Sequence, residues 1–189
     1  MEPATDHRYT ATMIAPTLIT PRLTLTGHTG DDLDDLAAMW ADPGVYGMIG
    51  GKPQSREEVW IRLLRSVGQW TLFGYGNWVL RDTATGRFIG SAGLLEARRA
   101  IDPPIDAPET GWALAAHAHG QGYAKEALDA VLAWSDAQRV PRTMCIIDPD
   151  NSASIRLAAK IGYRAIGRAT YHDRPVDLYE RMAGAGANG

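Results

Sequence analysis

The feature that most constrains the fold of this chain is a repeated switch between two hydrophobic periods. In the segment PRLTLTG, Leu23 and Leu25 alternate with polar neighbours, which is the two-residue period of a half-buried strand. Further along, Leu33, Leu36 and Trp40 recur at the spacing of one helical face, behind acidic residues that favour a helix start. A chain that changes period in this way is expected to form a sheet covered by helices.

The same two periods assign elements along the rest of the chain. Helices are expected over residues 31–41, after a capping box at Ser55 and Glu58, after the glycines at 120 and 122, and over residues 152–161. The expected strands are PRLTLTG, NWVLRD, RFIGSAGL, ETGWAL, TMCIIDP and the stretches 163–168 and 176–181. This order predicts an α/β (α+β) fold with a single mixed, mostly antiparallel sheet of about seven strands flanked by helices.

The helix after Ser55 carries an apolar stripe that assigns its buried face. Trp60, Leu63, Leu64 and Val67 follow a helical spacing. We therefore expect these side chains to pack against the sheet. The tryptophans, Trp60 included, are expected in the core or in a pocket wall rather than in a platform for stacking nucleic-acid bases.

Size and charge limit the classes of protein to which the chain can belong. With 189 residues, 45% of them hydrophobic, it is long enough for one compact domain, expected over residues 17–183 between a flexible arm (1–16) and a flexible tail (184–189). A net charge of −3 provides no general attraction for nucleic acid or for an anionic membrane surface, and no apolar run is long enough to cross a bilayer. The single cysteine, Cys145, excludes an internal disulfide and suits a reducing compartment, so the expected location is cytoplasmic.

The segment HAHGQGYAKEAL places Gly120 and Gly122 just ahead of an expected helix. Glycines at such a turn let backbone N–H groups and the positive end of the helix dipole point at one anion. The dinucleotide-binding fingerprint needs a third glycine where this chain has Lys125, and the Walker A spacing is absent. Two glycines alone also fit an ordinary turn. The choice between a phosphate-binding loop and an ordinary turn therefore depends on the neighbouring motifs.

Several motifs in the same order carry a family resemblance. ETGWALAAHAHGQGYAKEAL, then a strand, then NSASIRLAAKIGYRAIG resemble the GNAT N-acetyltransferases, in particular the ribosomal-protein N-terminal acetyltransferase (RimJ/RimL-like) type. TPRLTLTG, DPGVYGMIGG, SREEVWIRLL and RFIGSAGL each stand where that family would have them, so the resemblance covers roughly residues 20–182. It implies a GNAT fold whose sheet is splayed between its fourth and fifth strands, ETGWAL and TMCIIDP, with acetyl-CoA inserted there as cosubstrate.

The resemblance also assigns the residues that would bind acetyl-CoA. The family's phosphate loop has Arg or Gln, then Gly three positions later, then Gly or Ala two positions after that; here these positions are His119, Gly122 and Ala124. His119 departs from this pattern and brings less positive charge than arginine would. We therefore expect the chain to bind acetyl-CoA more weakly or in a pH-dependent way, or His119 to make no contact with the ligand. The fourth strand is expected to pair with the pantetheine arm. The implied cofactor-binding residues are Trp112, Ala113, Leu114, His119, Gly120, Gln121, Gly122, Tyr123, Ala124, Lys125, Asn151 and Ser154.

Acetyl transfer from a thioester to an amine needs a base, a donor for the developing oxyanion and an acid for the departing thiolate. Glu109 stands where similar enzymes often have a glutamate that faces the substrate. It either acts as the base or forms a salt bridge with a nearby arginine. The N–H of Leu114 is the expected oxyanion donor.

The expected acid departs from the pattern of the superfamily. Many members use a tyrosine seven residues after an asparagine, a position held here by Ala158. In the ribosomal-protein branch an earlier serine takes this role, which corresponds to Ser154, three residues after Asn151. Ser154 either donates a hydrogen bond toward the sulfur or bonds to the backbone of its own helical turn. Asn151 caps the helix, binds pantetheine, or does both.

Three functions are open at this point. The first is an active N-acetyltransferase whose acceptor is a primary amine, on a protein N-terminus or a small molecule. The second is a CoA-binding module without catalysis, as Ala158 and His119 would allow. The third is an interaction domain that reuses the fold. His117 and His119 are spaced like metal ligands, but no cysteine or acidic cluster accompanies them, so no metal is expected. The chain is expected to be a monomer or a homodimer.

Overall fold

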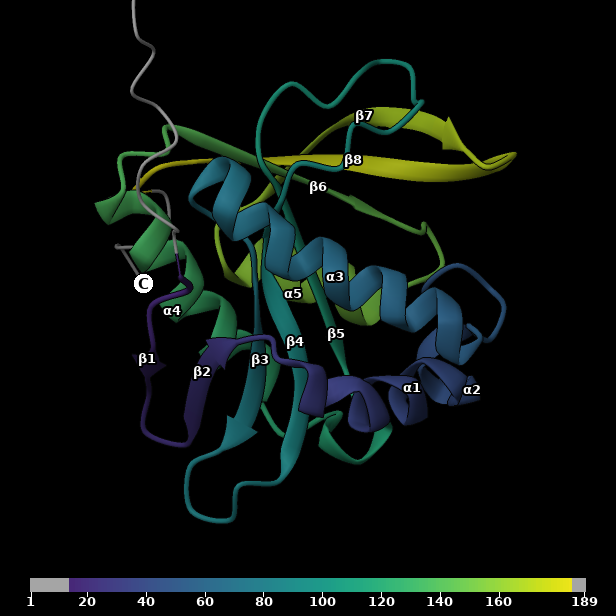
Figure 1. The fold of residues 1–189 in the computed structure, drawn as a ribbon. Coiled ribbons are helices and arrows are strands. Elements are labelled where there is room, and N and C mark those ends of the chain that lie inside the picture. The colour runs from purple at the N-terminus through teal and green to yellow at the C-terminus, as the bar shows by residue number, and fades with distance from the viewer. Residues whose placement is uncertain (1–13, 185–189) are drawn as a thin grey trace, which may run out of the picture.

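Residues 14–184, which the computed structural model describes, form one eight-stranded sheet with helices on both faces (Figure 1). The order of strands across the sheet is β1-β2-β3-β4-β5-β6-β8-β7. The strands are β1 (Leu18–Ile19), β2 (Leu23–Gly27), β3 (Asn77–Asp82), β4 (Phe88–Leu95), β5 (Glu109–Leu114), β6 (Arg142–Ile147), β7 (Arg164–Tyr171) and β8 (Arg174–Met182). The helices are α1 (Leu33–Ala41), α2 (Pro43–Tyr46), α3 (Arg56–Phe73), α4 (Tyr123–Ala137) and α5 (Ser152–Lys160), with short 3-10 helices η1 (Gly30–Asp32) and η2 (Ala116–Ala118).

This architecture confirms the fold class expected from the sequence and adds short elements, among them β1 and α2. β1 has two residues, too few to show a period, and pairs with β2 through Leu18 and Leu25. Helix α2 begins two residues after position 41, where the first helix was expected to end. The Asp42 carboxylate accepts a hydrogen bond from the N–H of Gly44 (2.7 Å), and Pro43 occupies the first helical position, where its missing N–H has no cost.

The expected arm and tail lie mainly outside the described residues, which exclude 1–13 and 185–189. At the described end of the arm, Ala15 packs against the core, and the Pro16 carbonyl accepts a 2.7 Å hydrogen bond from Nε1 of Trp78. The domain therefore includes residues 15 and 16.

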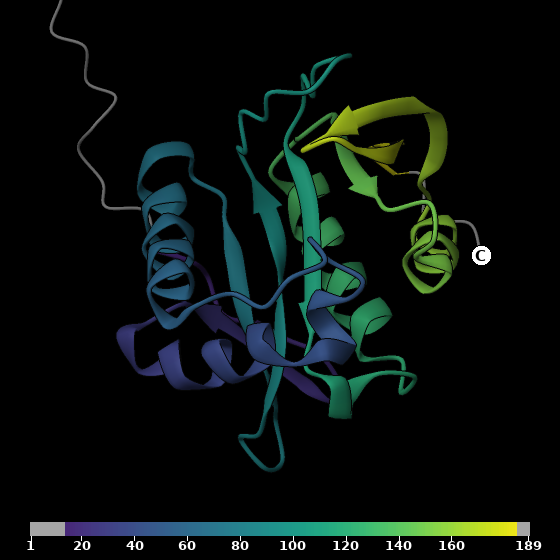
Figure 2. The ribbon, with the colours of Figure 1, turned by 90° about the vertical axis from the view of Figure 1, so that its right-hand side faces the viewer.

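Helices α1 and α3 cover one face of the sheet, and α4 and α5 cover the other (Figure 2). Successive side chains of a strand point to opposite faces. Along β5, Ala113 consequently joins the core under α1 and α3, whereas Leu114 joins the larger core under α4. The same alternation places Glu109 on the α3 side and Thr110 on the α4 side.

The apolar stripe predicted for α3 is correct only at Leu63, because the helix turns a different face to the protein. Trp60, Leu64 and Val67 are exposed by 39%, 50% and 42% of their surface. Apolar residues surround much of this helix, so their spacing fits more than one buried face. The face that packs includes Trp70, whose ring makes edge contacts with Trp78 at a centroid distance of 4.6 Å. The buried residues of α3 are Val59, Leu63, Ser66, Gln69 and Trp70.

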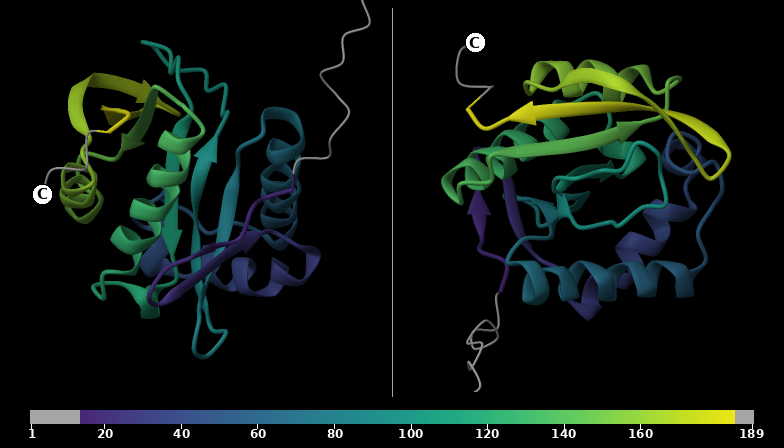
Figure 3. Two further views of the ribbon diagram at one scale, coloured as in Figure 1. Left: turned by 90° about the vertical axis from the view of Figure 1, so that its left-hand side faces the viewer. Right: turned by 90° about the horizontal axis from the view of Figure 1, so that it is seen from above.

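The sheet parts between β5 and β6. These strands contain the segments ETGWAL and TMCIIDP, between which the family resemblance implied a splayed sheet. These two strands are the parallel neighbours in the described sheet, and one register pair, Glu109 with Met144, joins them. By contrast, six register pairs join β4 to β5, and six join β6 to β8. Seen from above, β6, β8 and β7 lie on the opposite side of the molecule from α3 (Figure 3, right).

Candidate functional site

Three buried hydroxyl groups join β5 and β6 where the two strands begin to separate. The phenol oxygen of Tyr163 lies 2.6 Å from Oγ1 of Thr110 on β5 and 2.6 Å from Oγ1 of Thr143 on β6. Burial raises the pKa of Tyr163, so its hydroxyl stays protonated and available as a donor. No local pattern predicts this contact, because the three residues are far apart along the chain. The contact among the three hydroxyl groups holds β5 and β6 together at the closed end of the opening.

Beyond this closed end, β5 presents an unpaired edge toward β6. The N–H of Ala115 donates to the Ile89 carbonyl of β4 (2.9 Å), and the Pro108 carbonyl accepts from the N–H of Met144 on the other side (3.0 Å). Because backbone groups of alternate residues point to the same edge of a strand, Trp112 and Leu114 direct their N–H groups toward β6. Pairing with β6 ends at Met144, so both groups face the opening.

The expected phosphate loop connects η2 to α4. Gly120 and Gly122 have φ of 73° and 81°, in the left-handed region that glycine adopts without strain. Within residues 14–184, none of the backbone N–H groups of residues 120–125 donates a hydrogen bond to a protein acceptor. These amides, at the positive end of a 15-residue helix, can bind a diphosphate.

Arg22 braces this loop from the start of β2, a contact that the sequence reading missed. Its Nη1 donates to the Gln121 carbonyl (3.0 Å), and its guanidinium carbon lies 4.4 Å from the centroid of the Tyr123 ring. Its Nε forms a 2.6 Å ion pair with Oε2 of Glu126. Arg22 therefore holds the loop, while Glu126 balances its charge.

Two histidines, His117 within η2 and His119 directly after it, bind different strands. Nε2 of His119 lies 2.9 Å from the Leu114 carbonyl, and Nε2 of His117 lies 3.0 Å from the Phe88 carbonyl. A carbonyl only accepts, so Nε2 carries the proton in both rings. His119 thus occupies the Leu114 carbonyl and leaves the Leu114 N–H facing the opening.

Several other predicted cofactor residues make contacts of their own. The register pairs Ala113 with Ser91 of β4, so the backbone of Ala113 points away from the opening. Nζ of Lys125 forms an ion pair with Asp129 (2.7 Å) on the exposed face of α4. The Gln121 side chain donates to the His117 carbonyl (2.6 Å). The backbone of Ala113 and the side chains of Gln121 and Lys125 are therefore already engaged. The backbone N–H groups of Gln121 and Lys125 are the groups that these three residues can offer a ligand.

Asn151 and Ser154 lie at the start of α5, across the sheet from Glu109. Oδ1 of Asn151 accepts a hydrogen bond from the N–H of Ser154 (3.0 Å), and Nδ2 lies 3.4 Å from the Met48 carbonyl. The capping role expected of Asn151 is therefore present. Ala158, where many relatives have tyrosine, is fully buried in the core, so this position has no room for a phenol.

Glu109 is buried and bound by an arginine. Nε and Nη2 of Arg99 donate to Oε2 and Oε1 of Glu109 at 2.7 and 2.8 Å. The guanidinium carbon of Arg99 lies 4.8 Å from the centroid of the Tyr171 ring. Burial alone would lower the pKa of Arg99, but the hydrogen bonds and charge of Glu109 raise it. The salt bridge that the sequence left as an alternative is thus formed.

The comparison with protein families now decides the identity. The model of the acetyltransferase (GNAT) domain matches residues 22–164, which include the loop, the opening and the start of α5. The chain is a GNAT acetyltransferase. Enzymes of this family transfer an acyl group from acetyl-CoA to an amine.

Known proteins agree with this assignment. The YkkB protein of Bacillus subtilis (strain 168), itself uncharacterized, is 31% identical over 171 residues, or 88% of this chain and 95% of YkkB. A structure from Bordetella pertussis assigned to the GNAT acetyltransferases superposes with a TM-score of 0.78 at 29% identity, over 88% of this chain and 99% of that one. An acetyltransferase from Agrobacterium tumefaciens gives 0.78 at 27% identity, over 88% and 94%.

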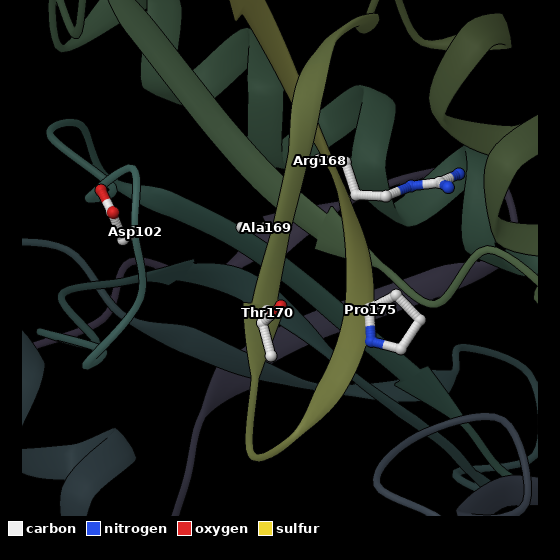
Figure 4. Close-up of a pocket in the computed structure, with 5 residues that line it drawn as sticks. All are labelled: Asp102, Arg168, Ala169, Thr170 and Pro175. Atoms are coloured by element: carbon white, nitrogen blue, oxygen red, sulfur yellow. The ribbon is translucent and has the colours of Figure 1, made fainter.

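Two surface pockets of the acetyltransferase are lined by no residue of β6 or of the phosphate loop. One, of about 420 Å³, lies beside the β7–β8 hairpin and is lined by Asp102, Arg168, Ala169, Thr170 and Pro175 (Figure 4). In Figure 4, Asp102 and Arg168 lie on opposite sides of the hairpin, and Arg168 is already paired with Asp177 (2.8 Å). The other, of about 310 Å³, lies between α1 and η2.

The described residues contain neither a membrane-spanning helix nor a cluster of metal ligands. No helix within residues 14–184 is both long and apolar enough to cross a membrane. Over the same residues, no group of three or more His, Cys, Asp or Glu side chains has the arrangement of a metal site.

Proposed function

We propose that this enzyme acetylates a primary amine, on a protein N-terminus or a small molecule, by direct attack on acetyl-CoA within a ternary complex. The observation that carries the proposal is the combination of free amides at residues 120–125 with an unpaired β5 edge leading away from them. The amides would bind the diphosphate, and Trp112 and Leu114 would pair with the pantetheine arm. This places the thioester toward the closed end of the opening.

In this proposal, the two faces of the sheet have different chemical roles. The amine attacks the thioester carbonyl from the α3 side, where Glu109 accepts its proton directly or through water. The Leu114 N–H, or the Trp112 N–H two residues nearer to Glu109, binds the developing oxyanion. The carbon–sulfur bond then breaks, and Ser154 on the α5 side donates a hydrogen bond or relays a proton to the leaving thiolate. Arg99 must loosen its hold on Glu109 during the proton transfer, because it occupies both carboxylate oxygens.

Solved relatives of the same fold act on chemically different amines, so the fold leaves the acceptor open. They include RimL, a ribosomal L7/L12 α-N-protein acetyltransferase in complex with CoA (TM-score 0.72, 16% identity). A spermidine N-acetyltransferase from Vibrio cholerae binds CoA and spermine (0.70, 16%), and a phosphinothricin acetyltransferase from Sinorhizobium meliloti binds acetyl-CoA (0.68, 22%). A RimJ/RimL-like role in the cytoplasm is part of the proposal.

The test combines acetyl-CoA with a panel of amines and follows the release of free thiol. Turnover that depends on an amine supports the proposal. A second candidate function, binding of CoA without catalysis, is favoured by the buried Ala158, which excludes the usual tyrosine acid. It predicts that CoA protects the protein against heat while no amine is acetylated. Absence of both effects would contradict both functions.

A further inference from the structure

Three arginines, Arg62, Arg65 and Arg99, lie near one another on the α3 side, and one of them, Arg99, binds Glu109. Arg62 and Arg65, three residues apart, lie on neighbouring turns of α3, and Arg99 comes from the loop between β4 and β5. In Figure 1, α3 crosses in front of the sheet, with this loop and the β7–β8 hairpin above it. The loop contacts β7 through a bridge between Asp102 and Thr170.

Arg62 and Arg99 are held in place by neighbouring side chains. The guanidinium carbon of Arg62 lies 4.3 Å from the centroid of the Trp40 ring, and its Nε donates to Oε1 of Gln54 (3.1 Å). Gln54 is neutral, so this contact orients Arg62 without balancing its charge. Arg99 is bound to Glu109 and stacks on Tyr171. Both guanidinium groups are therefore oriented before any ligand binds.

The positive charges on this side exceed the negative charge. Among residues 14–184, Arg99 is paired with Glu109, whereas neither Arg62 nor Arg65 has an acidic partner within salt-bridge distance. Burial, then the charges of Arg65 and Arg99, lower the pKa of Arg62 to about 10, while Tyr171 and Glu58 raise it. Desolvation and then Arg99 also lower the pKa of Arg65.

Arg65 is nevertheless exposed to solvent, which screens much of this repulsion and leaves the side chain available to a ligand. Like charges held together near a reaction centre indicate an anion that binds between them.

We infer that the acceptor of this enzyme is an amine that also carries a carboxylate or an equivalent anionic group, bound by Arg62 and Arg65. The inference rests on the proposed function, because Glu109 marks the side from which the amine approaches. An arginine fork matches a carboxylate in geometry and charge. A polyamine would instead meet like charges. Free amino-acid derivatives and acidic peptide N-termini share the required chemistry.

Two matched pairs of amines test the inference and distinguish its two sources. Isoglutamine and glutamine amide differ in one side-chain carboxylate, and so do the peptides Ser-Glu-Ala-amide and Ser-Gln-Ala-amide. Each pair keeps the surroundings of its amine nearly constant. We expect kcat/KM to be about tenfold or more higher for the anionic member of at least one pair, the size of effect typical of a charged hydrogen bond. Spermine should be a poor acceptor.

Variants on α3 test whether Arg65 causes the preference for the anionic amine. R65Q should remove most of the difference within the preferred pair, chiefly by raising KM for the anionic member. R56Q is the matched control, because Arg56 lies on the same helix in an exposed pair with Asp34. R56Q should leave the preference intact. Equal kcat/KM within both pairs, or an equal loss for both members in R65Q, would overturn the inference.

Failure of the proposed function would look different, since no amine would then be acetylated. Heat protection by N-acetylisoglutamine, compared with N-acetylglutamine amide, still tests the anion site in that case. Protection by the anionic compound alone, absent in R65Q, supports the site. Equal protection by both compounds, or protection by neither, contradicts it.

Discussion

Arg99 binds both carboxylate oxygens of Glu109, at 2.7 and 2.8 Å, and Glu109 is 4% exposed. The candidate base is therefore also the partner of a partly buried cation. Removing one member of such a pair leaves the other uncompensated, which is costly. Any test of catalysis at Glu109 must separate these two roles.

E109Q is expected to lower kcat by about 100-fold or more, the range typical of a lost general base. The dissociation constant for acetyl-CoA should stay within a factor of two or so, because the phosphate loop is distant along β5. R99Q keeps the carboxylate and removes its clamp, so it should retain much more activity than E109Q. Equal losses of activity in the two variants would assign Glu109 a structural role only.

S154A is expected to lower kcat about tenfold, less than E109Q, because a hydrogen bond to the thiolate is a smaller contribution than proton abstraction. S152A is the control, since Ser152 lies in the same first turn of α5 and is exposed. Pre-steady-state rates of thiol release measure the step directly. Identical rates in both variants and the unchanged enzyme would remove Ser154 from the mechanism.

G122A is expected to weaken acetyl-CoA binding about tenfold, because a left-handed residue with a Cβ is strained by about 1–2 kcal/mol and shifts the loop. Its Cβ would also lie 3.4 Å from Nη2 of Arg22. G86A is matched, with φ of 71° in the β3–β4 turn and open space around its Cβ. Isothermal titration should show the loss of affinity in G122A alone. A comparable loss in both would indicate general destabilisation.

Y163F is expected to lower the free energy of unfolding by about 1–3 kcal/mol, because buried hydroxyls of Thr110 and Thr143 lose their shared partner. Y75F removes a phenol that lies on a partly exposed contact with Glu96 at 3.3 Å, so its effect should be near zero. Urea unfolding of both variants gives the comparison. A cost for Y163F no larger than for Y75F would show that these hydroxyls do not stabilise the closed end.

Stability is expected to fall in acid partly because of His28. Burial lowers its pKa to about 4 from 6.5, with Asp32 acting in the opposite direction. Ser91 Oγ already donates to the Trp78 carbonyl, so it accepts from Nε2 of His28, and Nδ1 has no partner among the described residues. The unfolded chain binds a proton at His28 below about pH 6.5, whereas the folded one does so only near pH 4.

The contribution of His28 is therefore fully present above pH 6.5 and is lost as the pH falls toward 4, by up to about 3 kcal/mol. H28Q keeps a donor for Ser91 and cannot titrate. The free energy of unfolding of H28Q should depend less steeply on pH between 6.5 and 4. Parallel curves for the two proteins would show that carboxylates alone cause the acid sensitivity.

The sequence by itself determined the order of elements and the position of the loop. Hydrophobic period is a local property, so Leu23 and Leu25 mark a strand, and Leu33, Leu36 and Trp40 mark α1, whatever surrounds them. Gly120 and Gly122 were recognisable because their backbone conformation excludes most other residues.

The tertiary structure decided which groups meet. The face of α3 could not be read from its own residues, because apolar residues lie on more than one side of the helix and only packing against the sheet and Trp78 selects the buried side. The choice between base and salt bridge at Glu109 depended on Arg99, ten residues away in a loop without a period. The contacts of Arg22 with Gln121 and of Tyr163 with Thr110 join distant parts of the chain. Local patterns carry no record of such contacts, because they form only when the strands and helices pack together.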